Sequence, residues 1–160
     1  MGLTDPPKGA FTDPRHPKLG WRLYSTDAEK FNQPINWTKL RVDYVIPEYG
    51  SELTGESYIL EMGFERLNGV DFKKGCYVGQ EVTARMKHKT ELHKGLVKIG
   101  SEETMVNGEE LFLNDKPIGS VLTVYDRSAL AYVRLKNRDE ILSTKSTKRI
   151  FVDTNPISSN

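Results

Sequence analysis

Hydrophobic and polar residues follow two different periods along this chain, and the change falls near residue 92. Before it, apolar side chains recur at helical spacing over 36–45, and Pro47 ends that pattern. A second helix is predicted over 80–88, although it lacks a clean apolar stripe. Residues 19–25 alternate between apolar and polar side chains and predict a strand. The first part of the chain is therefore expected to mix helix and strand.

Beyond residue 92 the pattern becomes one of short apolar runs separated by turn residues. Asn114-Asp115 is a candidate for one tight turn. Several short strands without intervening helices are typical of a small antiparallel barrel or sandwich. The predicted fold class is thus α+β, with an α+β region at 1–92 and a β-barrel domain at 93–160. The expected strands are 95–99, 110–113, 118–125, 129–135 and 148–152.

Composition narrows the possible classes of protein. The apolar fraction is 37% and no window approaches the roughly 18 apolar residues of a membrane span, which predicts a protein outside the membrane. The amino terminus shows neither a secretory layout nor an Arg-rich transit pattern, so the simplest expectation is a cytoplasmic location. The mitochondrial matrix is the alternative for a eukaryotic source.

The net charge of +1 conceals two segments of opposite sign. Residues 73–98 hold seven bases and two acids, a local charge of +5, whereas residues 100–117 carry a local charge of −4. Charge runs are usually solvated surface, and the alternative is that the basic stretch attracts a polyanionic ligand. Neither segment resembles an RNA-reading module, so direct nucleic-acid binding is not expected.

The single cysteine, Cys76, stands between two glycines and follows two lysines. One cysteine forms no internal disulfide. A thiol near the start of the predicted helix would be favoured as thiolate, and Lys74 would act in the same direction. The alternative is that Cys76 is a small buried hydrophobic residue. No metal site is predicted, because His88 and His93 are five residues apart without further ligands at zinc spacing.

The octapeptide at 74–81, Lys-Gly-Cys-Tyr-Val-Gly-Gln-Glu, resembles the signature of the YgfZ-type folate-binding proteins. These are relatives of the aminomethyltransferase (T-protein) of the glycine cleavage system, and they include a mitochondrial iron–sulfur assembly factor. Further similar segments follow in the family's order. They are Asp13–Arg22, Leu67–Phe72, Val82–His88, Ile118–Val121 and Ala129–Leu135.

The resemblance covers only the carboxy-terminal portion of the family's pattern. It implies a partial ferredoxin-like, T-protein-like α+β body followed by the barrel. The missing amino-terminal half would then come from elsewhere, or a homodimer would cover the exposed surface. A departure follows the second helix, where Glu91 interrupts a stretch that is Arg-rich in the family.

The resemblance implies a folate-binding accessory protein, without turnover of its own, that supports iron–sulfur cluster assembly or repair in client enzymes, including tRNA-modifying ones. Cys76 would be the functional thiol and Lys74 its supporting base. The thiol could act as a nucleophile, as a redox group or as one ligand of a shared cluster, since a cluster takes about four ligands. The remaining motif residues are Gly75, Tyr77, Gly79, Gln80 and Glu81.

Tetrahydrofolate, or a one-carbon derivative, is the cofactor that the resemblance implies. A flat pterin would stack on an aromatic ring, and an anionic glutamate tail would pair with arginine. The candidates are Tyr77, Trp21, Arg85 and Arg22, with Arg15 as a weaker one. For each of these an ordinary structural role is an equal alternative.

Two other functions remain open from the sequence. One is a true aminomethyltransferase that transfers a one-carbon unit to tetrahydrofolate. The other is a plain interaction module in which the barrel docks partners and Cys76 is inert.

Overall fold

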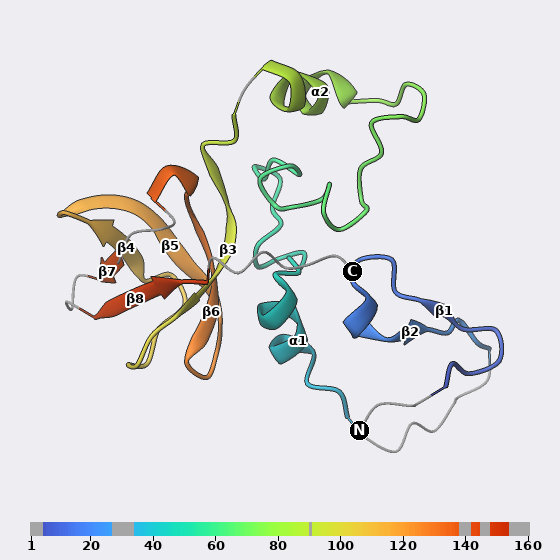
Figure 1. The fold of residues 1–160 in the computed structure, drawn as a ribbon, viewed down its shortest axis with the longest axis horizontal. Helices are drawn as coiled ribbons and strands as arrows, with labels where there is room; N and C mark the ends of the chain where they lie inside the picture. Colours follow the sequence, from blue (N-terminus) through green and yellow to red (C-terminus); the bar gives the residue numbers. More distant parts are fainter. Residues whose placement is uncertain (1–4, 27–33, 90, 138–141, 145–147, 154–160) are drawn as a thin grey trace.

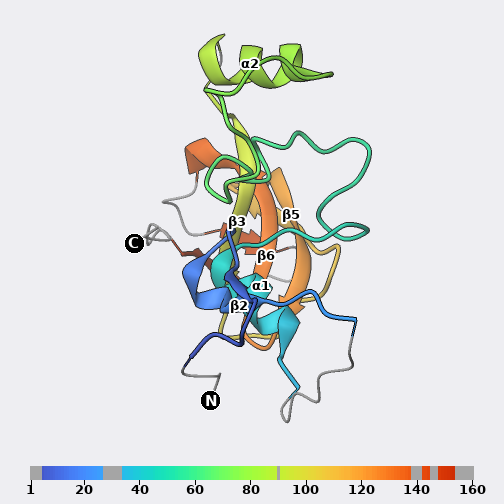
Figure 2. The same cartoon turned by 90° about the vertical axis from the view of Figure 1, so that its right-hand side faces the viewer.

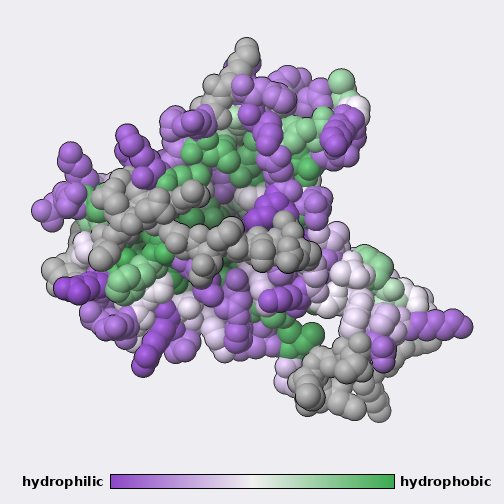
Figure 3. Space-filling model, viewed as in Figure 1, coloured by the Kyte–Doolittle hydropathy of each residue, from purple (hydrophilic) through white to green (hydrophobic). Residues whose placement is uncertain are grey.

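A closed β-barrel and a region of helices and long loops lie side by side in the computed structural model (Figures 1 and 2). The structure describes residues 5–26, 34–89, 91–137, 142–144 and 148–153. In a space-filling view the outer edge of the molecule is mainly hydrophilic, while hydrophobic residues gather between the barrel and α2 (Figure 3). The predicted α+β class with a small antiparallel barrel is confirmed.

Six antiparallel strands close the barrel in the order β3-β6-β5-β4-β7-β8. β3 and β6 pair over seven residues, from Lys94 opposite Arg134 to Gly100 opposite Ser128. β8 completes the ring by pairing with β3 at only two positions. The strands are β3 (Lys94–Gly100), β4 (Glu110–Leu113), β5 (Lys116–Tyr125), β6 (Ser128–Arg134), β7 (Leu142–Thr144) and β8 (Arg149–Val152). A short 3-10 helix, η2 (Leu135–Asn137), follows β6.

Alternate residues of these strands fill the barrel, as period-2 patterning requires. The core includes Ile99, Leu111, Val121, Leu142 and Ile150, all 1% exposed or less. The strands β5 and β6 approach one another most closely at a glycine. A Cβ atom built on Gly119 would lie 2.2 Å from the carbonyl oxygen of Tyr132. Only a residue without a side chain fits there.

The turn predicted at Asn114-Asp115 joins β4 to β5. Both residues adopt positive φ angles, 49° and 62°, as a two-residue type I′ hairpin requires. Asn and Asp tolerate this left-handed conformation better than other side chains do. Local turn chemistry therefore fixes the register of this hairpin.

Two strand predictions need correction. The strand expected over 19–25 is only two residues long, β2 (Trp21–Arg22), and it pairs with an unpredicted strand, β1 (Phe11–Thr12). In addition, β7 had no predicted counterpart, because a three-residue strand is too short to show a period. A 3-10 helix, η1 (Pro17–Leu19), lies between β1 and β2.

The helix α1 (Trp37–Tyr44) matches the predicted 36–45 and carries well-defined caps. The Asn36 side chain accepts a hydrogen bond from the Lys39 backbone N–H at 2.9 Å. At the other end Val45 adopts a left-handed conformation, with φ 51° and ψ 55°, which is unfavourable for a β-branched residue. Arg66 donates to the carbonyl oxygens of Tyr44 and Val45 at 3.1 and 2.7 Å and so stabilises this helix end.

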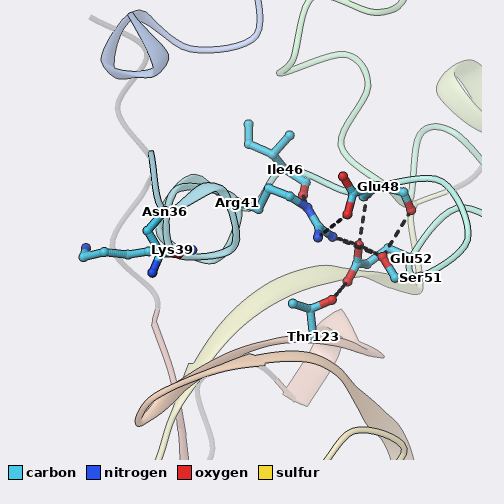
Figure 4. A network of polar contacts seen from close by, with 8 residues as sticks. All are labelled: Asn36, Lys39, Arg41, Ile46, Glu48, Ser51, Glu52 and Thr123. Atoms are coloured by element: carbon cyan, nitrogen blue, oxygen red, sulfur yellow. Dashed lines mark hydrogen bonds and ion pairs between the residues drawn. The ribbon is translucent and has the colours of Figure 1, made fainter. Parts of the chain in front are cut away.

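α1 is attached to the barrel by apolar and ionic contacts. Val42 and Val45 pack against Leu130 of β6. Arg41 of the same helix forms a buried ion pair with Glu52, whose carboxylate also accepts a hydrogen bond from the Thr123 hydroxyl of β5 (Figure 4). The helix, the loop after it and the barrel are therefore joined at one point.

Burial by itself would raise the pKa of Glu52. Hydrogen bonds from Thr123 and Ser51 and from the Glu48 backbone N–H outweigh burial and hold this pKa below its usual value. Arg41 also donates to Glu48 at 2.6 Å. The charged form of the network is thus the stable one in the fold.

Replacing Gly119 with alanine should destabilise the barrel by about 3 kcal/mol or more, because a main-chain oxygen cannot move away from the new methyl group. Chemical denaturation of both proteins measures the difference. Gly100→Ala is the matched control, since a Cβ there meets its nearest atom at 3.7 Å. Equal losses in the two variants would contradict the close approach of β5 and β6.

Candidate functional site

Cys76 lies in an exposed loop that leads into α2 (Gln80–Lys89). The alternative of a buried hydrophobic thiol is therefore wrong for this structure. The predicted start of the second helix at residue 80 is confirmed. The helix begins four residues after the cysteine, so that a turn separates the thiol from the first helical residue.

That turn spans Tyr77–Gln80 and contains two reciprocal contacts. The Gln80 N–H donates to the Tyr77 carbonyl oxygen at 3.3 Å, and the Gln80 side chain accepts from the Tyr77 N–H at 3.2 Å. Gly79, at the third position, has a φ of +82°, as a type II turn requires. Gly79 therefore has a conformational role, whereas Gly75 has an ordinary φ and open space around it.

Lys74 is directed at an aromatic ring of the same loop. Its Nζ lies 5.4 Å from the centroid of the Tyr77 ring, a cation–π distance. Tyr77 is half-buried, while Lys74 and Glu81 are exposed. The motif thus has a compact interior, formed by Tyr77 and Gln80, and an outer rim that carries Lys74, Cys76 and Glu81.

One side of α2 faces the preceding segment. Thr83 is buried, and Lys87 bonds both carboxylate oxygens of Glu65 at 2.6 and 2.8 Å. Phe72 contacts His88 edge-on, at 6.3 Å between ring centroids, and Lys87 lies over its face. The other side of the helix, which includes Arg85, is exposed.

Two arginines near the amino terminus that were proposed as folate contacts, Arg15 and Arg22, instead bind the carboxylate of Asp13. Asp13, only 4% exposed, accepts from Arg15 at 3.0 and 2.7 Å and from the Arg22 Nε at 2.8 Å. Burial alone would raise the pKa of Asp13, but these hydrogen bonds hold it well below its usual range. The same bond raises the pKa of Arg22. Arg15 also lies 5.2 Å from the ring of Trp37.

The four folate candidates therefore fall in two places. Tyr77 and Arg85 belong to the loop and α2, whereas Trp21 and Arg22 belong to the β1–β2 ribbon. Both views place α2 at one end of the molecule and the ribbon in the other half (Figures 1 and 2). The structure does not bring the two pairs together.

Sequence reasoning missed the carboxylate between the two arginines. Asp13 stands two residues before Arg15 and nine before Arg22 in the segment that carries the resemblance. It missed His16 as well, which is 7% exposed and stacks on Tyr44 at 4.3 Å. Burial, followed by the charges of Arg66 and Lys18, lowers the pKa of His16. The Asp-Pro-Arg spacing was the available signal.

The part of the chain that the structure describes contains neither a cluster of metal ligands nor a helix that could span a membrane. Within those ranges no three His, Cys, Asp or Glu side chains come together as a metal site would need. The helices that the structure describes are too short or too polar to cross a membrane.

No family model matches the chain. Curated relatives match this chain over part of their own length. The chain is 37% identical over 98 residues to the mitochondrial iron–sulfur cluster assembly factor IBA57 of Mus musculus, covering 56% of this chain and 27% of the relative. The human protein of that name is 36% identical over 95 residues, covering 54% and 27%. The IBA57 homolog of Neurospora crassa is 47% identical over 98 residues, covering 55% and 22%.

The chain thus spans about a quarter of the length of the curated relatives it matches. Homologues of this chain are iron–sulfur cluster assembly factors that are named as mitochondrial.

The Asp13 carboxylate should make the fold sensitive to acid. A lowered pKa contributes stability that is present above about pH 4, the usual range of an unfolded aspartate, and is lost as the pH falls further. Asp13→Asn should lower the free energy of unfolding at pH 7 by about 2 kcal/mol and give a shallower decline between pH 5 and pH 3. Urea titrations at several pH values measure both.

The exposed Asp71 provides the control, and Asp71→Asn should leave the pH dependence close to that of the wild type. An unchanged slope in Asp13→Asn would show that the carboxylate contributes nothing to acid sensitivity.

Proposed function

We propose that this chain acts in iron–sulfur cluster assembly in the mitochondrion, with the Cys76 thiol as its functional group. The exposed cysteine carries the proposal: its sulfur is accessible to a partner, in a chain whose homologues are named as assembly factors of such clusters. Thiolate sulfur is the protein ligand that iron–sulfur clusters use.

Of the three roles open to the thiol, a shared cluster ligand is the one proposed. A nucleophile needs a neighbouring base, and the Lys74 amine lies over the Tyr77 ring. One cysteine supplies only one of about four ligands. The remaining ligands would come from a partner that delivers or receives the cluster. The clients served in this way would include tRNA-modifying iron–sulfur enzymes.

Tetrahydrofolate is the proposed small ligand, and Tyr77 and Arg85 are its proposed contacts in this chain. The geometry favours this pair over Trp21 and Arg22, because Asp13 occupies the Arg22 guanidinium. Arg85 is exposed and forms no ion pair with any residue that the structure describes. Further contacts to the ligand would be supplied by another polypeptide segment.

In cells depleted of their own assembly factor, the wild-type chain should restore the activity of a [4Fe–4S] enzyme, and Cys76→Ala should reduce that rescue at least about tenfold, because the partner's cluster then lacks one of its ligands. Enzyme activity per unit of client protein is the readout. Lys8→Ala, which changes an exposed lysine of the lead-in, serves as the control. Full rescue by Cys76→Ala would remove the thiol from the mechanism, and failure of the wild type would refute the function.

Folate binding can be tested separately by titration calorimetry with tetrahydrofolate. Arg85→Ala should weaken binding about tenfold, the worth of one charge-assisted hydrogen bond, whereas Arg149→Ala, at an exposed arginine of β8, should not. Loss of binding in Arg22→Ala, with normal binding in Arg85→Ala and equal stability, would move the site to the ribbon.

A further inference from the structure

The outward side of α2 and the turn before it present apolar residues among bases. Val78 is fully exposed, with a relative exposure of 102%, and Val82, one turn later, is 53% exposed. Arg85 follows on the same side of the helix, at a spacing of three residues. Lys73 and Lys74 are exposed in the loop nearby. We refer to these five residues as the basic end.

The loop that follows β3 has the opposite charge and a similar apolar tip. Residues 101–108, the acidic loop, carry exposed Glu102 and Glu103, and Val106 is 61% exposed. Its shape is fixed, because Met105 is buried in the barrel and the Ser101 hydroxyl accepts from the Glu103 N–H at 3.1 Å. The acidic loop thus presents two exposed glutamates followed by an exposed valine, and the Lys148 ammonium binds the Thr104 carbonyl oxygen in the same loop at 2.7 Å.

These two surfaces point away from one another. α2 precedes β3, and β3 runs away from it, so that the acidic loop lies at the opposite end of the barrel (Figures 1 and 2). At the α2 end hydrophilic residues surround small hydrophobic areas (Figure 3). One copy of the chain cannot bring its own two ends into contact.

We propose that the basic end of one copy binds the acidic loop of a second copy, head to tail. The two surfaces carry opposite charge. At the basic end three bases outnumber the exposed Glu81, and in the acidic loop Glu102 and Glu103 precede the exposed Val106. The basic end includes Arg85 and lies beside Cys76, so a second copy bound there would compete with the proposed folate ligand and cluster partner. Sedimentation of the purified chain needs neither of them, so failure of this contact is distinguishable from failure of the proposed function.

Such a contact is heterologous, because two different patches meet and each copy keeps one patch unused. Copies therefore add in a row instead of closing as a symmetric dimer. A few side chains on each side bury less than a standard interface, so the association is weak and depends on charge. Salt should weaken it strongly, since the screening length falls from about 30 Å at 0.01 M to about 3 Å at 1 M.

Sedimentation equilibrium of the purified chain tests this. In about 0.01 M salt the weight-average mass should rise above the monomer mass of 18.2 kDa with increasing concentration, and in about 1 M salt it should return to that mass. A mass of 18.2 kDa at every concentration in low salt would overturn the proposal.

Charge reversal provides the sharper test. Arg85→Glu and Glu103→Lys should each lose most of the association alone, because each variant places like charges at positions 85 and 103 on the two surfaces that meet. Mixed together they should associate again in alternating order, because the reversed charges at positions 85 and 103 attract one another across one contact and Arg85 and Glu103 attract one another across the next. Arg149→Glu makes the same change in net charge at an exposed site in β8 and should associate as the wild type does.

A mixture that remains monomeric, or self-association that survives Arg85→Glu, would exclude this pairing of surfaces. Circular dichroism of each variant establishes that it is folded before its mass is measured by sedimentation.

Discussion

The buried ion pair between Arg41 and Glu52 connects three parts of the molecule. Their side chains are 5% and 0% exposed, so each charge is compensated by protein groups and not by water. Leaving one such charge without its partner costs about 3–5 kcal/mol. Glu52 also accepts from Thr123, which places the loop after α1 directly on the barrel. Val42, the next residue after Arg41, packs against Leu130 and adds an apolar contact between α1 and β6.

The position of the Cys76 loop depends on contacts that continue from this point along the outside of the barrel. The Leu96 N–H donates to the Glu61 carbonyl oxygen at 2.9 Å, and the Tyr132 hydroxyl donates to the Glu61 carboxylate. A Cβ atom on Gly95 would lie 3.1 Å from the Leu135 side chain and 3.4 Å from that carbonyl oxygen, so the glycine mainly makes room for Leu135. Glu65, four residues further on, holds α2 through Lys87. Among the residues that the structure describes, these contacts hold α2 from one side, and Cys76, Lys74 and Glu81 of the motif are exposed.

The basic residues near the Cys76 thiol and those of the β1–β2 ribbon differ in what they contact. In the ribbon, Asp13 neutralises Arg15 and Arg22 and fixes both in place, so these arginines serve the fold. Around Cys76 the lysines contact aromatic rings, and Arg85 projects outward. A guanidinium that is engaged by a buried carboxylate is fixed in place and has its charge neutralised, whereas an exposed one keeps its charge and all five N–H donors for a ligand. This difference is the physical reason for placing binding at the α2 end.

The sequence by itself determined the α+β class, both helices and five of the six barrel strands, because each of these has a local period or a local turn signal. Asn114-Asp115 is the clearest example, since two residues decide both the turn and the register. The Cys76 motif was also evident from the sequence, whereas the exposure of its thiol was not. Only the tertiary structure decided that Asp13 binds two arginines, that Glu52 is buried against β5, and that the folate candidates lie in two separate places. Those outcomes depend on which distant charges meet in a low-dielectric interior, and no periodicity of the chain encodes such pairings.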